Sequence, residues 1–419
     1  MSSQIAPRDS CIISLCDNPL SISAQTVTNE RSLEEAGQRQ KNATEENLTA
    51  IDDLYRPVLK VMKLSGAYFG ATSLANAVNS SRPRCHLSQL YCAIVAAGLW
   101  FDFVMPVVSA ILGDNIYLHI MFISWCLLVA LLGTTCLIVL PSTATRTSRF
   151  ETFIRKVISL DIERPYLEKV KSRLKVYLIM FSILAIASVG GAFLTDLLLE
   201  MNIANAWPWK KWFVFRITSL IFLTCSIGVW FFPIPLFCAT CLILEACFDD
   251  LYNLLSPQHP NSSHSNLLSI ESLRQQHQNL CQLVEAADSL FSPLLLEIVG
   301  FSIPVMCFNF YQVAHSQNKK DLAFVISVLF WLLSSVTILT VVLINGSKVS
   351  EKIHAVQKIL PKMPAAAEEE GKVLLLMMDL QGEPRGLSIG GLSVITKSLS
   401  ISIVGVIISY VAVILSLPS

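Results

Sequence analysis

Seven long apolar runs constrain this chain of 419 residues more strongly than any other feature of its sequence. A bilayer core about 30 Å thick needs roughly 20 apolar residues in helical conformation to cross it, and every run reaches that length. The runs are Leu87–Leu112, Ile116–Leu140, Val176–Leu199, Trp212–Leu244, Leu294–Val313, Leu322–Ile344 and Val394–Leu417. The sequence therefore predicts an all-α, polytopic membrane protein with seven transmembrane helices.

Charge is scarce in this chain, and its scarcity excludes most soluble classes of protein. Charged residues make up 15% of the sequence and hydrophobic residues 53%, whereas soluble domains carry about 25% charged residues. Basic and acidic residues both number 31, so the net charge is zero. We exclude a soluble enzyme of this length. Nucleic acid is not an expected partner either, because a neutral chain has no strong electrostatic attraction to it.

The sequence contains no motif that points to catalysis, a metal or a cofactor. A nucleophile elbow, a Walker loop, an HExxH pair and paired carboxylates within a span are all missing, and these are the common signatures of such chemistry. Cys238 and Cys241 have the spacing of half a zinc site, but they lie in an apolar run without a second pair of ligands. We therefore expect neither enzymatic activity nor a cofactor.

Basic residues are distributed unevenly between the spans. They concentrate before the first span and in the connections 141–175 and 345–393, whereas each alternate loop carries at most two lysines. The connection 246–293 weakens this asymmetry, because it carries only one basic residue, Arg274. Because cytoplasmic loops are enriched in Lys and Arg, this asymmetry predicts a cytoplasmic N-terminus, an extracellular C-terminus and a multi-pass protein of the plasma membrane. Five glycosylation sequons fall on the predicted cytoplasmic side, where we expect them to stay unmodified. They begin at Asn42, Asn47, Asn79, Asn261 and Asn345.

Composition divides the chain into three predicted parts. Residues 1–51 read as a disordered cytoplasmic tail, residues 52–84 as an amphipathic or re-entrant N-terminal helix, and residues 85–419 as the seven-helix transmembrane domain. The apolar face of the N-terminal helix comprises Ile51, Leu54, Val58, Val61, Met62 and Leu64. With basic residues opposite, this face suits either an anionic membrane surface or an ordinary cytosolic helix.

Three cytoplasmic connections, 141–175, 246–293 and 345–393, also repeat apolar residues at helical spacing. The apolar positions are Phe150, Phe153, Ile154, Val157 and Ile158, then Leu273, Leu280, Leu283, Val284, Ala287 and Phe291, then Val349, Ile353, Val356 and Leu360. Amphipathic helices in water need partners for their apolar faces. We expect the membrane helices to continue into the cytoplasm and to form a bundle there, which subunits can share.

Polar and aromatic residues occur within several spans, where burying a polar group in lipid is costly. A pocket that opens outward and binds a small molecule would use such side chains. An interfacial aromatic belt with hydrogen bonds between helices is the alternative. The candidate pocket residues are Asp102, Trp125, Trp230, Phe308, Asn309, Tyr311, Gln312 and Trp331.

The seventh span carries a stripe of small, mostly polar residues at steps of three and four. The stripe consists of Ser398, Ser402, Gly405, Ser409, Ala412 and Ser416. Small residues let helices pack closely. In a symmetric ring of subunits, however, the same stripe would face a water-filled path, with Val413 and Leu417 as an apolar constriction. The sequence leaves both interpretations open.

Four segments resemble the insect gustatory receptor family and its gustatory-receptor-like relatives in other animals. They are Asp53–Lys60, Gln276–Val284, Phe291–Leu296 and Ser409–Leu417. That family ends its last helix in Thr-Tyr, five apolar residues, and Gln-Phe or Gln-Leu. This chain keeps the spacing and Tyr410, while Ser409 and Ser416 replace the threonine and the glutamine.

The resemblance implies a chemosensory subunit of a ligand-gated, non-selective cation channel. A role in taste and a role in development are equally open. The partners of the subunit would be the lipid bilayer, a small-molecule ligand and further subunits in a homotetramer or a heterotetramer. Because the last helices line the pore in that family, Val413, Ser416 and Leu417 would lie at the extracellular gate. The competing predictions are a G-protein-coupled receptor with its N-terminus outside the cell and, less favoured, a transporter.

Overall fold

A computed structural model describes the chain at residues 38, 46–70, 86–112, 116–140, 149–160, 164–199, 213–255, 270–315, 322–356, 371, 377–378 and 385–416. The chain divides into two compact units, Met1–Asn47 and Leu48–Ser419. Every element discussed below belongs to the second unit. The predicted tail, 1–51, lies mostly outside the described residues.

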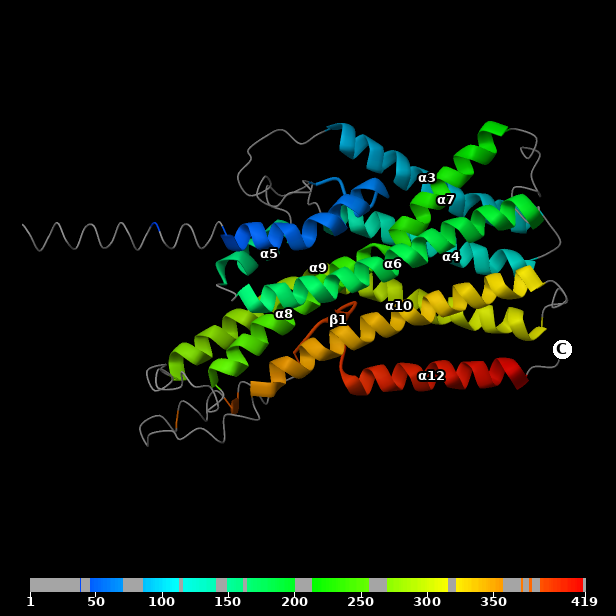
Figure 1. The fold of residues 1–419 in the computed structure, drawn as a ribbon. Coiled ribbons are helices and arrows are strands. Elements are labelled where there is room, and N and C mark those ends of the chain that lie inside the picture. The colour runs from blue at the N-terminus through cyan, green and yellow to red at the C-terminus, as the bar shows by residue number, and fades with distance from the viewer. Residues whose placement is uncertain are drawn as a thin grey trace, which may run out of the picture. The chain divides into compact units, whose positions relative to one another are not determined.

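Long helices dominate the second unit (Figure 1). After a helix at residues 48–64, the elements are α3 (His86–Leu112), α4 (Ile116–Val139), α5 (Arg149–Ser159), α6 (Arg164–Leu199), α7 (Phe213–Phe231), α8 (Pro233–Leu255), α9 (Ile270–His315), α10 (Leu322–Ala355), β1 (Ser388–Ile389), β2 (Ser393–Val394) and α12 (Lys397–Ser416). The predicted spans lie in α3, α4, α6, α7 with α8, α9, α10 and α12, which confirms the fold class. Among the described residues, six stretches are long and apolar enough to cross a membrane, and α4 adds the shorter Ile123–Val139.

Proline divides the fourth predicted span into two helices. Pro233 and Pro235 stand in the first turn of α8, where the missing N–H of proline costs no helical hydrogen bond. The amide of Phe232 still donates to the carbonyl of Gly228 at 3.0 Å. The two helices therefore follow each other with little interruption, and together they cover the single run predicted from the sequence.

Helix α9 continues through two internal prolines, Pro293 and Pro304. Proline at position 293 removes the N–H that would bond to the carbonyl of Ser289, four residues earlier. Arg149, at the start of α5, donates from Nη1 to this carbonyl at 3.3 Å. The hydrogen bond that the backbone loses is thus replaced by a side chain from another helix, which also ties α5 to α9.

The apolar face of the helix at 48–64 packs against protein, except at its last residue, Leu64, which is 76% exposed. Leu54, Tyr55 and Val58 are each at most 3% exposed. The Tyr55 ring meets Phe150 of α5 edge to face, with centroids 5.6 Å apart, and its hydroxyl lies 3.2 Å from Oγ1 of Thr240 in α8. Burial raises the pKa of the Tyr55 phenol, so this group stays neutral. Because α5 and α8 cover this face, a lipid surface is not what buries it.

The amphipathic positions of the three predicted connections are buried, as their spacing predicts, except Ile158, which is only partly buried. On α5, Phe150, Phe153, Ile154 and Val157 are at most 1% exposed. The buried positions of α9 are Leu273, Leu280, Leu283, Val284, Ala287 and Phe291, and those of α10 and its end are Val349, Ile353 and Val356. Leu360 lies outside the described residues. The apolar faces of these extended helices therefore pack on one another within a single chain.

A short β-hairpin between α10 and α12 was not predicted, since the connection 345–393 was expected to be helical. Strands β1 and β2 pair antiparallel, with Ser388 opposite Val394 and Ile389 opposite Ser393. Gly390 and Gly391 turn the chain at φ values of 64° and 71°, a left-handed conformation that glycine adopts without steric cost. The Gly-Gly pair between two short runs was the available hairpin signal.

One of the five sequons can be assigned from its environment. The side chain of Asn345, in α10, is 2% exposed. Its Nδ2 donates to the carbonyl of Val341 at 2.8 Å and to the hydroxyl of Tyr177 in α6 at 3.2 Å. A glycan needs a solvent-exposed asparagine, so the buried Asn345 is not a glycosylation site.

Candidate functional site

Helix α12 packs on α9 and α10 along one side only (Figure 1). Ile403 and Ile407 are partly buried against the hydrophobic core, and Val411 and Ile414 are also partly covered. No side chain of α12, all of which the structure describes, is buried. A helix this apolar does not leave most of its circumference in water, so lipid or further protein must cover the rest.

The stripe of small residues lies opposite the packed face of α12. At about 100° per residue, Ser409 points away from the direction of Ile403 and Ile407. All six stripe positions, Ser398, Ser402, Gly405, Ser409, Ala412 and Ser416, are exposed. The stripe therefore does not pack against another helix of its own chain. The interpretation as a close-packing surface is excluded within a single subunit.

Serine hydroxyls in the stripe donate back to their own helix. Ser402 Oγ donates to the carbonyl of Ser398 at 3.0 Å, Ser409 Oγ to that of Gly405 at 2.9 Å, and Ser416 Oγ to that of Val413 at 2.7 Å. This pattern is common for serine within membrane helices. With its donors satisfied, the stripe offers oxygen lone pairs on a narrow surface, which water or a passing cation can approach.

Large residues flank the stripe on both sides. Tyr410 and Val413, on one flank, are 55% and 58% exposed. On the other flank Ile401 and Ile408 are 73% and 63% exposed. Leu417, the second residue of the predicted constriction, lies outside the described residues. Of the predicted gate residues, Val413 and Ser416 lie exposed in the last turn of α12, and their role as a gate stays a prediction.

A carboxylate of α9 anchors the hairpin that leads into α12. Asp288 Oδ1 accepts hydrogen bonds from the backbone N–H of Ser388 at 2.5 Å and from its hydroxyl at 2.8 Å. The amide of Gly390 donates to the carbonyl of Ser292, one turn further along α9, at 3.0 Å. We call these contacts the Asp288–Ser388 clamp. They join the start of the predicted pore helix to the bundle.

Two of the predicted pocket residues meet inside the bundle. The rings of Trp125 in α4 and Trp331 in α10 have centroids 5.6 Å apart and planes inclined by 60°. Trp331 also contacts Phe330 edge to face at 6.0 Å. These residues come from spans far apart in the sequence, so their contact depends on the tertiary packing of α4 and α10.

Asn309 of α9 lies at the level of the two tryptophans. Thr135 of α4 donates to Glu297 Oε1 of α9 at 2.5 Å, and the second and fifth spans cross in opposite directions. Trp125 precedes Thr135 by ten residues. Because the two helices run in opposite directions with the same rise per residue, Trp125 lies level with the residue ten positions after Glu297, which is residue 307. Asn309 is wholly buried, and its side-chain oxygen and nitrogen have no hydrogen-bond partner among the described residues.

A buried amide without partners is unfavourable by about 1–3 kcal/mol, and folded proteins keep few such groups. Water or a ligand with a hydrogen-bonding group would relieve this cost. Gln312, one turn further along α9, likewise has a buried Oε1 without a partner among the described residues. The Asn309 level of the bundle is thus the strongest candidate for a ligand contact.

The remaining predicted pocket residues are not linked to this level by a described contact. Trp230 is 2% exposed at the end of α7. Asp102 is half-buried on α3, and Phe308 and Tyr311 are half-buried on α9. Their grouping with Asn309 into one pocket stays a prediction from the sequence.

Three polar residues at the helix interfaces were missed in the sequence. Glu297 lies in the fifth span, and its buried Oε2 has no hydrogen-bond partner among the described residues. The buried Oγ atoms of Ser302 and Ser334 likewise have no partner there. An acidic residue inside an apolar run is a signal by itself, and Glu297 could have been found in that way. The two serines could not, because serine also occurs commonly in packed membrane helices.

Comparisons with known proteins agree with this architecture. A family model described as 7tm chemosensory receptor matches residues 55–415. The fold is similar to that of the insect olfactory receptor OR5 from Machilis hrabei in complex with eugenol, with a TM-score of 0.68 and 13% identity over 88% of this chain and 99% of that one. A second structure of the same receptor gives a TM-score of 0.66 with the same identity and coverage. No match was found among curated protein sequences.

Proposed function

Because this chain belongs to the 7tm chemosensory receptor family, we propose that it is one subunit of a ligand-gated, non-selective cation channel in the plasma membrane. The observation that carries the proposal is the exposed stripe of α12, which points away from its own bundle. In a ring of four subunits, four such stripes would surround a water-filled path across the membrane. The apolar flanks of α12 would then contact lipid or neighbouring subunits.

The outer end of α12 is the proposed gate. Val413 and Leu417 would narrow the path with apolar side chains, and Ser416 would supply the polar lining between them. Ser409 would line the path further in. An apolar constriction stops ions because water leaves it readily, so small movements of α12 are enough to open or close the pore.

The proposed ligand is a small molecule that is mostly apolar and carries a hydrogen-bonding group. Trp125 and Trp331 would contact its apolar part, and the amide of Asn309 would bind its polar group. The unpartnered side chain of Asn309 supports this proposal, as does eugenol, a small molecule, in the structure of the similar olfactory receptor. The spacing from Ser409 to Leu417, with Tyr410, favours a gustatory-receptor-like role within the family.

Expression of the chain alone in oocytes tests the proposal. Epitope tags at both ends, stained on intact cells, should detect the C-terminus and not the N-terminus. A panel of small organic molecules should then evoke a cation current that requires no G protein. An accessible N-terminus would instead support the competing G-protein-coupled receptor, and substrate flux without channel current would support a transporter.

Replacement of Asn309 by leucine separates a binding role from a structural one. We expect the variant to be at least as thermostable as the natural chain, because an unpartnered buried amide is removed. Loss of one hydrogen bond to the ligand should raise the half-maximal ligand concentration about tenfold. Thermostability is measured on purified protein, and the ligand response is measured from current.

Ser302→Ala is the matched control, because Ser302 is also buried on α9 without a partner among the described residues. It lies two turns from Asn309, further from the level of the tryptophans, and its removal should leave the ligand response unchanged. A loss of stability in Asn309→Leu, combined with an unchanged ligand response, would contradict the binding role.

A further inference from the structure

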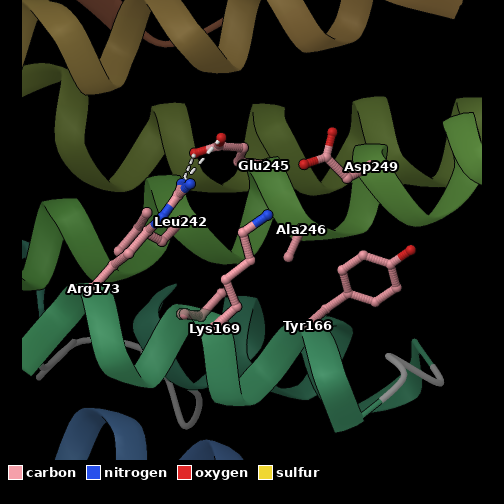
Figure 2. A pocket seen from close by; sticks show the side chains of 8 residues that line it. Tyr166, Lys169, Arg173, Leu242, Glu245, Ala246 and Asp249 are labelled. Atoms are coloured by element: carbon pink, nitrogen blue, oxygen red, sulfur yellow. Dashed lines mark hydrogen bonds and ion pairs between the residues drawn. The ribbon is translucent and has the colours of Figure 1, made fainter.

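A charged hollow lies between α6 and α8 and is lined by neither the stripe nor Asn309. Its lining residues are Tyr166, Lys169, Val170, Arg173, Leu242, Glu245, Ala246 and Asp249. Figure 2 shows the side chains of α6 reaching toward those of α8 across this hollow. Neither the proposed pore nor the proposed ligand contact uses any of these residues.

Both carboxylates of the hollow already have basic partners. Arg173 Nη1 lies 3.3 Å from Glu245 Oε1 (Figure 2), and Lys352 of α10 forms an ion pair with Asp249. Lys169 adds a third cation, which makes no ion pair or hydrogen bond with any residue that the structure describes. Three basic side chains against two carboxylates leave one positive charge at this place.

The hydroxyl of Tyr166 forms the end of the hollow nearest the start of α6. It accepts a hydrogen bond from Nδ2 of Asn253 in α8 at 2.6 Å. The hydroxyl proton of Tyr166 therefore points away from Asn253, and no acceptor for it is found among the described residues. A hydroxyl donor, an ammonium group and a guanidinium group thus lie along one side of α6, which is a suitable arrangement for oxygen atoms of a phosphate.

The same side of α6 continues as an apolar, exposed surface. Lys169, Arg173 and Val176 are spaced by four and three residues and so share one face. The face continues through Ile179, Ile183 and Ile186. Val176 and these three isoleucines are 65%, 51%, 61% and 72% exposed. In a membrane helix such a surface faces lipid chains, so the hollow lies at the level where the lipid headgroups begin.

We propose that this hollow binds the headgroup of an anionic phospholipid. The phosphate would lie on Lys169 and Arg173, where basic pockets between membrane helices hold such headgroups. The acyl chains would extend along Val176, Ile179 and Ile183. A soluble phosphate compound would match the charges but would leave this apolar surface unused, which favours lipid. With the orientation of the proposed function, this lipid lies in the cytoplasmic leaflet. Binding of the headgroup to the hollow does not depend on that orientation.

Lys169→Gln tests the proposal without disturbing either ion pair. The full-length protein is purified in detergent with equal amounts of phosphatidylserine and phosphatidylcholine, and retained lipids are identified by native mass spectrometry. Loss of one lysine near a lipid headgroup should reduce the retained phosphatidylserine, relative to phosphatidylcholine, about fivefold. Binding is measured directly, so the result is independent of whether the chain conducts ions.

Lys171→Gln is the matched control, because Lys171 is two residues away and points to the opposite side of α6. It is similarly exposed, and its nearest carboxylate is Asp53 at 4.0 Å. This variant should retain as much phosphatidylserine as the natural chain. Equal losses in both variants, or no loss in Lys169→Gln, would overturn the site. Displacement of phosphatidylserine by soluble glycerophosphoserine at equal concentration would overturn the role of the acyl chains.

Discussion

Replacing Ser409 with tryptophan should abolish most of the ligand-evoked current while the chain still folds. Ser409 is exposed on the face of α12 that points away from the bundle, so the larger side chain does not enter the packed core of its own subunit. Exposed substitutions of this kind change stability by less than about 0.5 kcal/mol. In a ring of four subunits, four indole rings would occupy the same level of the pore. We expect the current to fall at least about tenfold, since bulky apolar constrictions exclude water and ions.

The control for this prediction is Ile408→Trp. Ile408 is the neighbouring residue and is 63% exposed, but it lies on the flank of α12, about 100° away from the stripe. This variant should keep most of the current, with equal surface expression measured by biotinylation. Loss of current in Ile408→Trp with normal current in Ser409→Trp would contradict the assignment of the stripe to the pore.

Replacing Asp288 with alanine should uncouple α12 from the bundle. The clamp places the N–H of Ser388 and its hydroxyl on one carboxylate, and hydrogen bonds to charged groups contribute about 1.5–3 kcal/mol each. Ser388 is 6% exposed, so water does not readily replace the lost acceptor. We expect a lower midpoint of thermal unfolding. We also expect the maximal ligand-evoked current to fall about threefold or more, with unchanged ligand affinity, because the proposed binding level at Asn309 lies elsewhere in the bundle.

Two further variants make the clamp prediction specific. Glu285→Ala removes an exposed carboxylate of α9 one turn before Asp288 and should change neither stability nor current. Ser388→Ala, alone and combined with Asp288→Ala, completes a double-mutant cycle that measures the coupling between the two residues. Additive effects in this cycle would show that the clamp does not act as a unit. Normal maximal current in Asp288→Ala would exclude it as a link to α12.

Local patterns were sufficient to predict the helices of this protein. The apolar runs predicted the spans because a membrane leaves no alternative to internally hydrogen-bonded helices. The amphipathic positions Phe153, Val284 and Ile353 were identified from spacing alone, and all three are buried. The stripe of α12 was also found from its period of three to four residues. In each case the information lies within one helix, so no knowledge of its neighbours was needed.

The contacts between helices were less predictable. Asn309 and Trp125 were named as pocket residues, but their common level follows from the register set by Thr135 and Glu297. The Asp288–Ser388 clamp joins residues that are 100 positions apart. Its hairpin was missed because two strands of two residues each carry almost no periodic signal. Polar contacts of this kind depend on which helices become neighbours, and short patterns do not encode that choice.

The sequence by itself determined that this chain crosses a membrane with seven helices, because apolar length and scarce charge permit no other class. It also determined which side of α12 is small and polar. Only the tertiary structure decided that this side points away from the bundle, that α5 and α8 cover one face of the helix at 48–64, and that Asn309 has no partner among the described residues. The physical reason is that burial and hydrogen bonding belong to pairs of surfaces. A single helix specifies only one surface of each pair.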